Sequence, residues 1–104
     1  MNKEHKVCTA SIFTEKLGGK WKLSIIYNLS KRSLRFGQLA AIIDGISRKV
    51  LTDHLKQLEN DKLISRQSFN ETPPRVEYSL TDIAKNLGPV LMSIDGWVNK
   101  NYIK

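Results

Sequence analysis

Polar side chains that can donate hydrogen bonds recur along one side of the segment 47–60. Leu51, Leu55 and Leu58 follow one another at helical spacing and therefore share one face of a helix. The other face carries long polar side chains, namely Lys49, Thr52, Asp53, Lys56 and Gln57. A helix that enters the major groove of DNA needs this division, because one face anchors it while donors on the other reach base edges and phosphates. The pattern predicts a DNA-recognition helix.

A shorter helix and a tight turn precede this segment. Residues 37–43 carry apolar side chains at the spacing of a short helix. Gly45 can adopt the positive φ that a sharp connection between two helices requires, and Ser47 is a good N-cap for the helix that follows. We therefore expect the stretch 36–62 to form a helix-turn-helix.

Two short strands are predicted after the helix-turn-helix. Segments 63–69 and 75–80 have the composition of strands, and the turn 70–74 between them contains two consecutive prolines. Proline has no amide hydrogen with which to extend a strand ladder, so this turn should project as a loop. A brief strand at 34–36 is expected to pair with the hairpin. Two helices followed by a hairpin make a winged helix.

Further helices are predicted before and after this unit. Segments 8–17 and 20–30 come first, and Ile12, Phe13 and Leu17 of the earlier one are expected to face the core. After the hairpin, Thr81 is expected to cap a final helix.

The final helix has a long apolar stripe that consists of Ile83, Leu87, Val90, Leu91, Ile94, Trp97 and Val98. The pair Gly88-Pro89 should bend or break this helix, because proline removes one of its hydrogen bonds. The stripe is longer than a domain of this size needs for its own core. A two-fold dimer interface is its expected use.

The composition limits the function classes. The chain has 104 residues and a formal net charge of +7, so we expect one domain over 1–104 with a polyanionic partner. The connection 31–35 is itself basic. We expect no membrane span and no signal peptide, and hence a cytoplasmic protein, because no apolar run is long enough for either. One cysteine cannot form an internal disulfide.

Several motifs, in this order and spacing, resemble the HxlR-type winged helix-turn-helix regulators, which are relatives of the MarR group. They are Cys8, Gly18-Gly19-Lys20-Trp21, Arg35-Phe36-Gly37-Gln38-Leu39, Gly45-Ile46-Ser47, the run Leu51…Leu55…Leu58-Glu59, and Pro73-Pro74-Arg75-Val76-Glu77-Tyr78-Ser79-Leu80-Thr81. The resemblance covers nearly the whole chain. It implies a mainly α fold with a small β-hairpin wing (α+β), and a homodimeric bacterial DNA-binding regulator without a cofactor. Its subunits would meet through the first and last helices, here Ile12, Phe13, Leu87, Val90, Leu91, Ile94, Trp97 and Val98.

The resemblance also assigns DNA contacts to positions of this sequence. Its recognition helix matches 47–60, so the candidates for double-stranded DNA are Ser47, Arg48, Lys49, Thr52, Asp53, Lys56 and Gln57. Because phosphate repels Asp53, it would have to accept a hydrogen bond from a cytosine amino group or orient a neighbouring base. The wing of the family matches 70–75, so Arg75 is a candidate for the minor groove or its flanking phosphates. The alternative is a surface ion pair of Arg75 with Glu71 or Glu77. Arg35 is a candidate for a phosphate contact.

Cys8 is the candidate for regulation by an oxidant or electrophile. Some members of the resembled family sense such compounds through a cysteine at this position, often with a second cysteine that this chain lacks. An adduct, a mixed disulfide or a Cys8-to-Cys8 bridge between subunits remain as outcomes. Lys6 and His5 would lower its pKa. The alternative is a small buried apolar residue on the first helix. A small-molecule effector acting through the final helix is a further interpretation.

Other functions have less support in the sequence. No Ser, His and acid constellation, glycine-rich phosphate loop or paired carboxylates point to an enzyme. His54 has no second ligand residue at metal-binding spacing, so we predict no metal site. The strongest alternative is a winged helix that serves as a protein- or RNA-interaction module.

Overall fold

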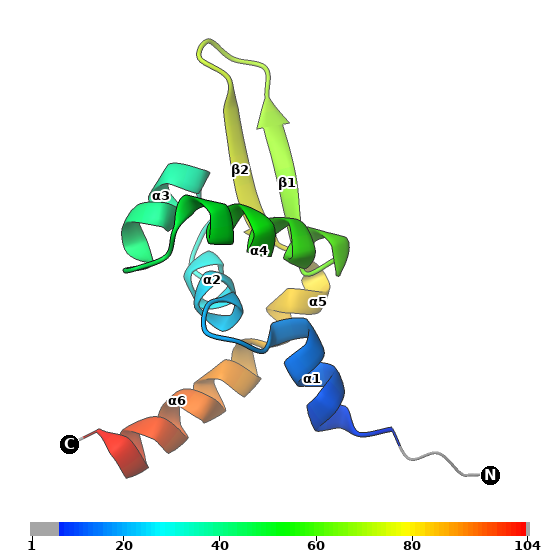
Figure 1. Ribbon diagram of the computed structural model, residues 1–104, viewed down its shortest axis with the longest axis vertical. Helices are drawn as coiled ribbons and strands as arrows, with labels where there is room; N and C mark the ends of the chain where they lie inside the picture. The colour runs from blue at the N-terminus through cyan, green and yellow to red at the C-terminus, as the bar shows by residue number, and fades with distance from the viewer. Residues whose placement is uncertain (1–6, 104) are drawn as a thin grey trace.

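The computed structural model describes residues 7–103 and has the predicted winged helix-turn-helix fold (Figure 1). The elements in chain order are α1 (Thr9–Leu17), α2 (Lys22–Leu29), α3 (Phe36–Ile42), α4 (Arg48–Asn60), β1 (Ile64–Phe69), β2 (Arg75–Leu80), α5 (Asp82–Lys85) and α6 (Gly88–Tyr102). The hairpin projects from one side of the α2–α5 core, while α1 and α6 diverge from the other side. No helix in the described part of the chain is long and apolar enough to cross a bilayer.

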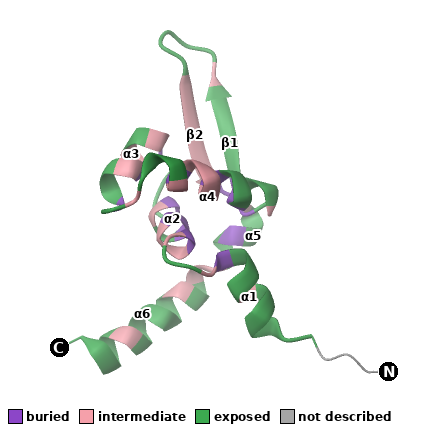
Figure 2. Cartoon of the chain, viewed as in Figure 1, coloured by how far each residue is buried: buried purple, intermediate pink, exposed green. Residues whose placement is uncertain are grey.

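The core forms around the apolar face of α4. Leu51 and Leu58 are completely buried and Leu55 nearly so, which confirms the predicted face. They belong to one cluster with Ile25 and Leu39, which come from the two preceding helices (Figure 2). Because these leucines cannot turn toward water without losing this burial, they fix the rotation of α4 about its axis.

The connection between α3 and α4 has the predicted geometry. Gly45 has a φ of 85°, in the left-handed region that favours glycine. The Ser47 hydroxyl accepts a hydrogen bond from the Val50 amide at 3.1 Å, so Ser47 caps α4 as expected. These two residues end one helix and start the next within a few residues.

The wing is an antiparallel hairpin that is joined to the helical core. β1 and β2 pair in the register Ile64↔Leu80 to Phe69↔Arg75. Leu34 adds the predicted brief strand contact, since its amide donates to the Tyr78 carbonyl at 3.0 Å and Tyr78 donates back at 2.8 Å. Leu34 is also buried. The orientation of the wing is therefore coupled to the segment that leads into α3.

The two outer helices contribute less to the core than the sequence predicts. In α1 Leu17 is buried, but Ile12 is 46% exposed, so the prediction that Ile12 packs inward is wrong for the single chain. No described residue of α6 is buried, and its apolar side chains Val90, Ile94 and Trp97 are exposed. Both helices extend beyond the body of the domain, which leaves their apolar faces open.

The predicted interruption of the final helix is a break. α5 ends at Lys85 and α6 begins at Gly88, with Pro89 in its first turn. Proline is tolerated there because the first-turn amides have no partner within the helix. Thr81 caps α5, since its hydroxyl accepts from the Ala84 amide at 3.3 Å.

Replacing Leu51 by alanine should lower the free energy of unfolding by about 2–5 kcal/mol, because it leaves a cavity under the centre of α4. Urea denaturation followed by circular dichroism measures this loss. Ile83→Ala is the matched control, since Ile83 is 61% exposed and its truncation should cost less than about 1 kcal/mol. Equal losses in the two variants would contradict the central place of Leu51 in the core.

Candidate nucleic-acid interface

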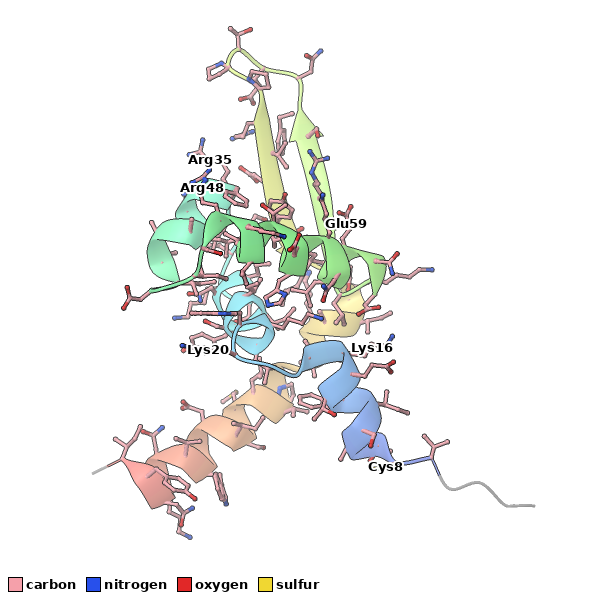
Figure 3. All side chains as sticks on the ribbon, in the orientation of Figure 1. Cys8, Lys16, Lys20, Arg35, Arg48 and Glu59 are labelled. Carbon is pink, nitrogen blue, oxygen red and sulfur yellow. The ribbon has the colours of Figure 1, made fainter. Side chains whose placement is uncertain are left out.

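The polar face of α4 points away from the core, toward the side of the molecule from which the wing projects. In Figure 3, Arg35 and Arg48 lie on the hairpin side of α4, whereas Lys16 and Lys20 lie on the opposite side. The other predicted contacts of α4 share its solvent side, with Ser47, Lys49, Lys56 and Gln57 exposed and Thr52 and Asp53 half-buried. The residues predicted to contact DNA in the major groove therefore form one continuous surface.

Lys49 and Asp53 form an ion pair on this surface. The Lys49 ammonium nitrogen lies 3.0 Å from a carboxylate oxygen of Asp53, one helical turn away. The Lys49 side chain is 84% exposed, so solvent screens the pair and its contribution is at most about 0.5 kcal/mol. Asp53 therefore orients Lys49 without preventing it from exchanging the carboxylate for a phosphate or a base.

Arg48 and Arg35 flank the start of α3. The Arg48 guanidinium lies 4.7 Å from the centroid of the Phe36 ring, a cation–π distance that limits the positions of its long side chain. The Arg35 amide donates to the Gln38 side-chain oxygen at 2.8 Å, which caps α3 and leaves the Arg35 side chain exposed. Phe36 thus helps to position Arg48, whereas the Arg35 side chain is free to move in solvent.

A hollow of about 380 Å³ lies between α4 and the base of the wing. Its lining includes Lys56 and Thr52 of α4 and Arg66 of β1, together with the acidic Glu59. Arg66 is not among the contacts predicted from the sequence, because nothing local distinguishes one polar residue of a short strand from another. Its position opposite Tyr78 in the strand register places it beside α4. Arg66 therefore adds a positive charge from the wing to the polar surface of α4.

Arg75 occupies the base of the wing loop in two ion pairs. Its two terminal nitrogens lie 3.0 Å from a Glu71 oxygen and 3.4 Å from a Glu77 oxygen, and its guanidinium lies 4.0 Å from the Phe69 ring centroid. The alternative interpretation, a surface ion pair, is therefore the arrangement in this structure. A minor-groove contact by Arg75 would require DNA to displace two carboxylates.

Cys8 lies immediately before α1 and its side chain is exposed, so the alternative of a buried apolar residue is wrong for the single chain. The thiol makes no regular N-cap hydrogen bond. Hydrogen bonding by the Ser11 side chain, followed by the Ser11 backbone, nevertheless lowers the pKa of Cys8 below its ordinary value. His5 and Lys6, also expected to lower it, lie outside the described residues. The hydrogen bonding by Ser11 therefore shifts Cys8 toward the thiolate form relative to a free cysteine.

His54 is half-buried beside the core. Burial, followed by the positive charge of Lys22, lowers its pKa, and its Nδ1 atom has no hydrogen-bond partner. Within residues 7–103 no group of His, Cys, Asp and Glu is arranged to hold a metal ion. Burial therefore disfavours the charged form of His54.

Comparison with known proteins gives concordant matches over most of the chain. Residues 16–104 match the family model for the HxlR-like helix-turn-helix. The chain is 45% identical over 86 residues to the uncharacterized HTH-type transcriptional regulator BH0655 of Halalkalibacterium halodurans, covering 82% of this chain and 76% of that protein.

Solved structures share the fold. The oxidized form of the redox regulator HypR is 32% identical, with a TM-score of 0.84 over 90% of this chain and 97% of that one. A regulator of Enterococcus faecalis V583 assigned to the MarR family is 40% identical, with a TM-score of 0.79 over 96% and 93% of the two chains. The similarity therefore includes α1 and α6 as well as the central winged helix.

Replacing Ser11 by alanine should raise the pKa of Cys8, because it removes the largest hydrogen-bonding contribution to the thiolate. The rate of iodoacetamide alkylation, measured over a pH series around the ordinary thiol pKa of about 8.5, reports this value. The midpoint should move to higher pH, so the variant reacts more slowly near neutrality. Ser68→Ala, on the exposed face of β1, should leave the midpoint unchanged. Identical midpoints in all three proteins would contradict the role of Ser11.

Proposed function

The chain belongs to the HxlR-like helix-turn-helix family of transcriptional regulators, and on this premise we propose that it represses transcription by binding an inverted-repeat operator as a homodimer. The observation that carries the proposal is the exposed polar face of α4, whose rotation the buried leucines fix. The protein is a DNA-binding regulator and not an enzyme.

In the proposed complex, α4 enters the major groove with its N-terminal half toward the bases. Arg48, Lys49 and Thr52 contact base edges there, and Ser47 at the start of the helix contacts the backbone. Lys56 and Arg66, on two sides of the hollow beside the wing, contact phosphates. The wing lies over the flanking minor groove, and Arg75 contributes only if it leaves Glu71 and Glu77.

The proposed dimer uses the apolar faces of α1 and α6. Ile12, Val90, Ile94 and Trp97 are each at least 41% exposed in the single chain, although such side chains are usually buried. Pairing these faces about a two-fold axis removes them from water and sets two α4 helices in successive major grooves, about 34 Å apart.

Oxidation or alkylation of Cys8 is the proposed control of this activity. One similar structure is that of a redox regulator, and the Cys8 thiol is exposed with a lowered pKa. Two Cys8 thiolates brought together by the dimer would form one disulfide and give two electrons to an external oxidant such as diamide. A quinone would instead add to one thiolate. Either product changes the start of α1, which belongs to the proposed interface.

Lys49→Ala should reduce discrimination at one base position by about 1–3 kcal/mol, whereas Lys56→Ala should weaken binding to all duplexes alike. Selection of duplexes from a random pool, followed by fluorescence anisotropy titrations, measures both effects. Because Lys49→Ala also exposes the unpaired Asp53 carboxylate to DNA, Lys49→Ala/Asp53→Asn isolates the loss of the lysine contact. Lys20→Ala removes a charge on the opposite side of α4 and should leave selectivity intact.

The salt dependence of binding tests the same surface. Contact with about 6–10 phosphates makes affinity fall steeply with salt, and Lys56→Ala should reduce the slope by about one. Salt-independent binding would favour the alternative of a protein-interaction module, and an RNA preference would favour the RNA module. If neither lysine substitution changes affinity for a selected operator, α4 does not contact the DNA.

Treatment with diamide or a quinone should release the wild-type protein from its operator but not the Cys8→Ser variant. Anisotropy before and after treatment, with mass spectrometry of the modified thiol, measures the effect. Reduction with dithiothreitol should restore binding after diamide, because a disulfide is reversible. Equal loss of binding in wild type and Cys8→Ser would exclude control through this thiol.

A further inference from the structure

Thr52 lies in the N-terminal half of α4, and its hydroxyl group is already engaged within that helix. The hydroxyl donates a hydrogen bond of 2.8 Å to the Arg48 carbonyl, one turn earlier. Because a hydroxyl carries a single proton, the Thr52 side chain has no donor left for a base or a phosphate. It can present to DNA only the lone pairs of its oxygen and its methyl group.

Aromatic residues surround the accessible side of Thr52. Thr52 lines the hollow of about 380 Å³ between α4 and the wing, together with Phe36 of α3 and Tyr78 of β2. Phe36 is half-buried, and its ring centroid lies 4.7 Å from the Arg48 guanidinium, one turn before Thr52. The Phe36 ring is therefore beside the same part of α4 as Thr52. A group that enters the hollow there meets carbon atoms from two helices.

The charged residues of this hollow are Lys56, Glu59 and Arg66. Lys56 and Glu59 follow Thr52 by about one and two helical turns, and Arg66 comes from the wing. Along α4 the lining thus changes from the uncharged Thr52 to charged groups toward the C-terminal half. A polar base edge would find partners near Lys56, whereas an apolar group fits beside Thr52.

The edges of the base pairs in the major groove carry one apolar group, the C5-methyl group of thymine. An amino group of adenine or cytosine could donate to the Thr52 oxygen, but it would also lose water against the Phe36 ring, which costs free energy. A thymine methyl group fits both surfaces, because it covers the Thr52 methyl group and the ring without giving up a hydrogen bond.

We propose that Thr52 and Phe36 bind the C5-methyl group of one thymine in each half-site of the operator. The inference rests on the proposed function and assigns a base to one contact of α4. Thr52 determines specificity through its methyl group, and the hydrogen bond to Arg48 holds the side chain in one rotamer, which fixes the direction of that methyl group.

Replacement of thymine by deoxyuridine tests this contact, because deoxyuridine pairs in the same way and lacks only the methyl group. Each thymine of a selected operator is replaced in turn, and the Kd is measured by fluorescence anisotropy. One replacement in a half-site should raise the Kd of the wild-type protein about fourfold, since the burial of about one methyl group is lost.

Two variants separate the methyl group of Thr52 from its hydroxyl. Thr52→Ser keeps the hydroxyl and loses the methyl group, so the thymine and deoxyuridine duplexes should differ less than about twofold in Kd. Thr52→Val keeps a methyl group and loses the hydroxyl, so the difference of about fourfold should remain. Circular dichroism verifies that both variants fold.

Thr14→Ser is the matched control. Thr14 is exposed on α1, and its hydroxyl donates to the Ser11 carbonyl of the same helix at 3.1 Å, as that of Thr52 does to Arg48. The substitution removes the same methyl group from a helix other than α4. The variant should distinguish thymine from deoxyuridine as strongly as the wild-type protein does.

Several results would overturn the methyl contact and leave the operator function intact. They are a selected half-site without thymine, no effect of any deoxyuridine replacement, and an undiminished effect in Thr52→Ser. Loss of the effect in Thr52→Val would assign the contact to the hydroxyl and would also overturn it. Failure of the wild-type protein to bind any selected duplex would instead refute the operator function itself.

Discussion

The burial of Leu51, Leu55 and Leu58 is the constraint on which the rest of the structure depends. Each side chain is almost fully removed from water against residues of α2 and α3. A rotation of α4 by a single residue, about 100°, would exchange these leucines for Thr52, Lys56 and Glu59. The direction in which the polar face of α4 points is therefore determined by packing on its other side.

The wing depends on the same core through a different interaction. Leu34 is buried with the leucines of α4 and also exchanges two backbone hydrogen bonds with Tyr78 of β2. A shift of the hairpin by one residue would turn its side chains to the opposite face and break this pair. Leu34 therefore links the wing to the core that holds α3 and α4, which keeps the wing and the polar face of α4 in a fixed relation.

The sequence predicted the features that depend on short repeats or on single residues with strong conformational preferences. Helical spacing identified α4, Ser47 its cap, and Gly88-Pro89 the break. Prediction from the sequence failed where the burial or partners of a residue depend on where its helix or strand lies in the folded domain. Ile12 and Cys8 are exposed because α1 extends beyond the core, which its own apolar residues do not indicate. The hollow that Thr52 and Arg66 line combines residues from separate elements, so no local pattern marks it.

The attachment of α6 explains how so small a domain could be controlled at a distance from its DNA-facing helix. Fifteen residues make α6 about 22 Å long, yet it packs on the core near its start, through Leu91 and through Leu87, the residue just before the helix. A rotation of about 5° at that base moves the far end by about 2 Å, from the same length. If α6 joins two subunits, this displacement changes the separation of two α4 helices that DNA requires to be one turn apart. A small displacement at the first turn of α6 is consequently amplified toward the far end of the helix.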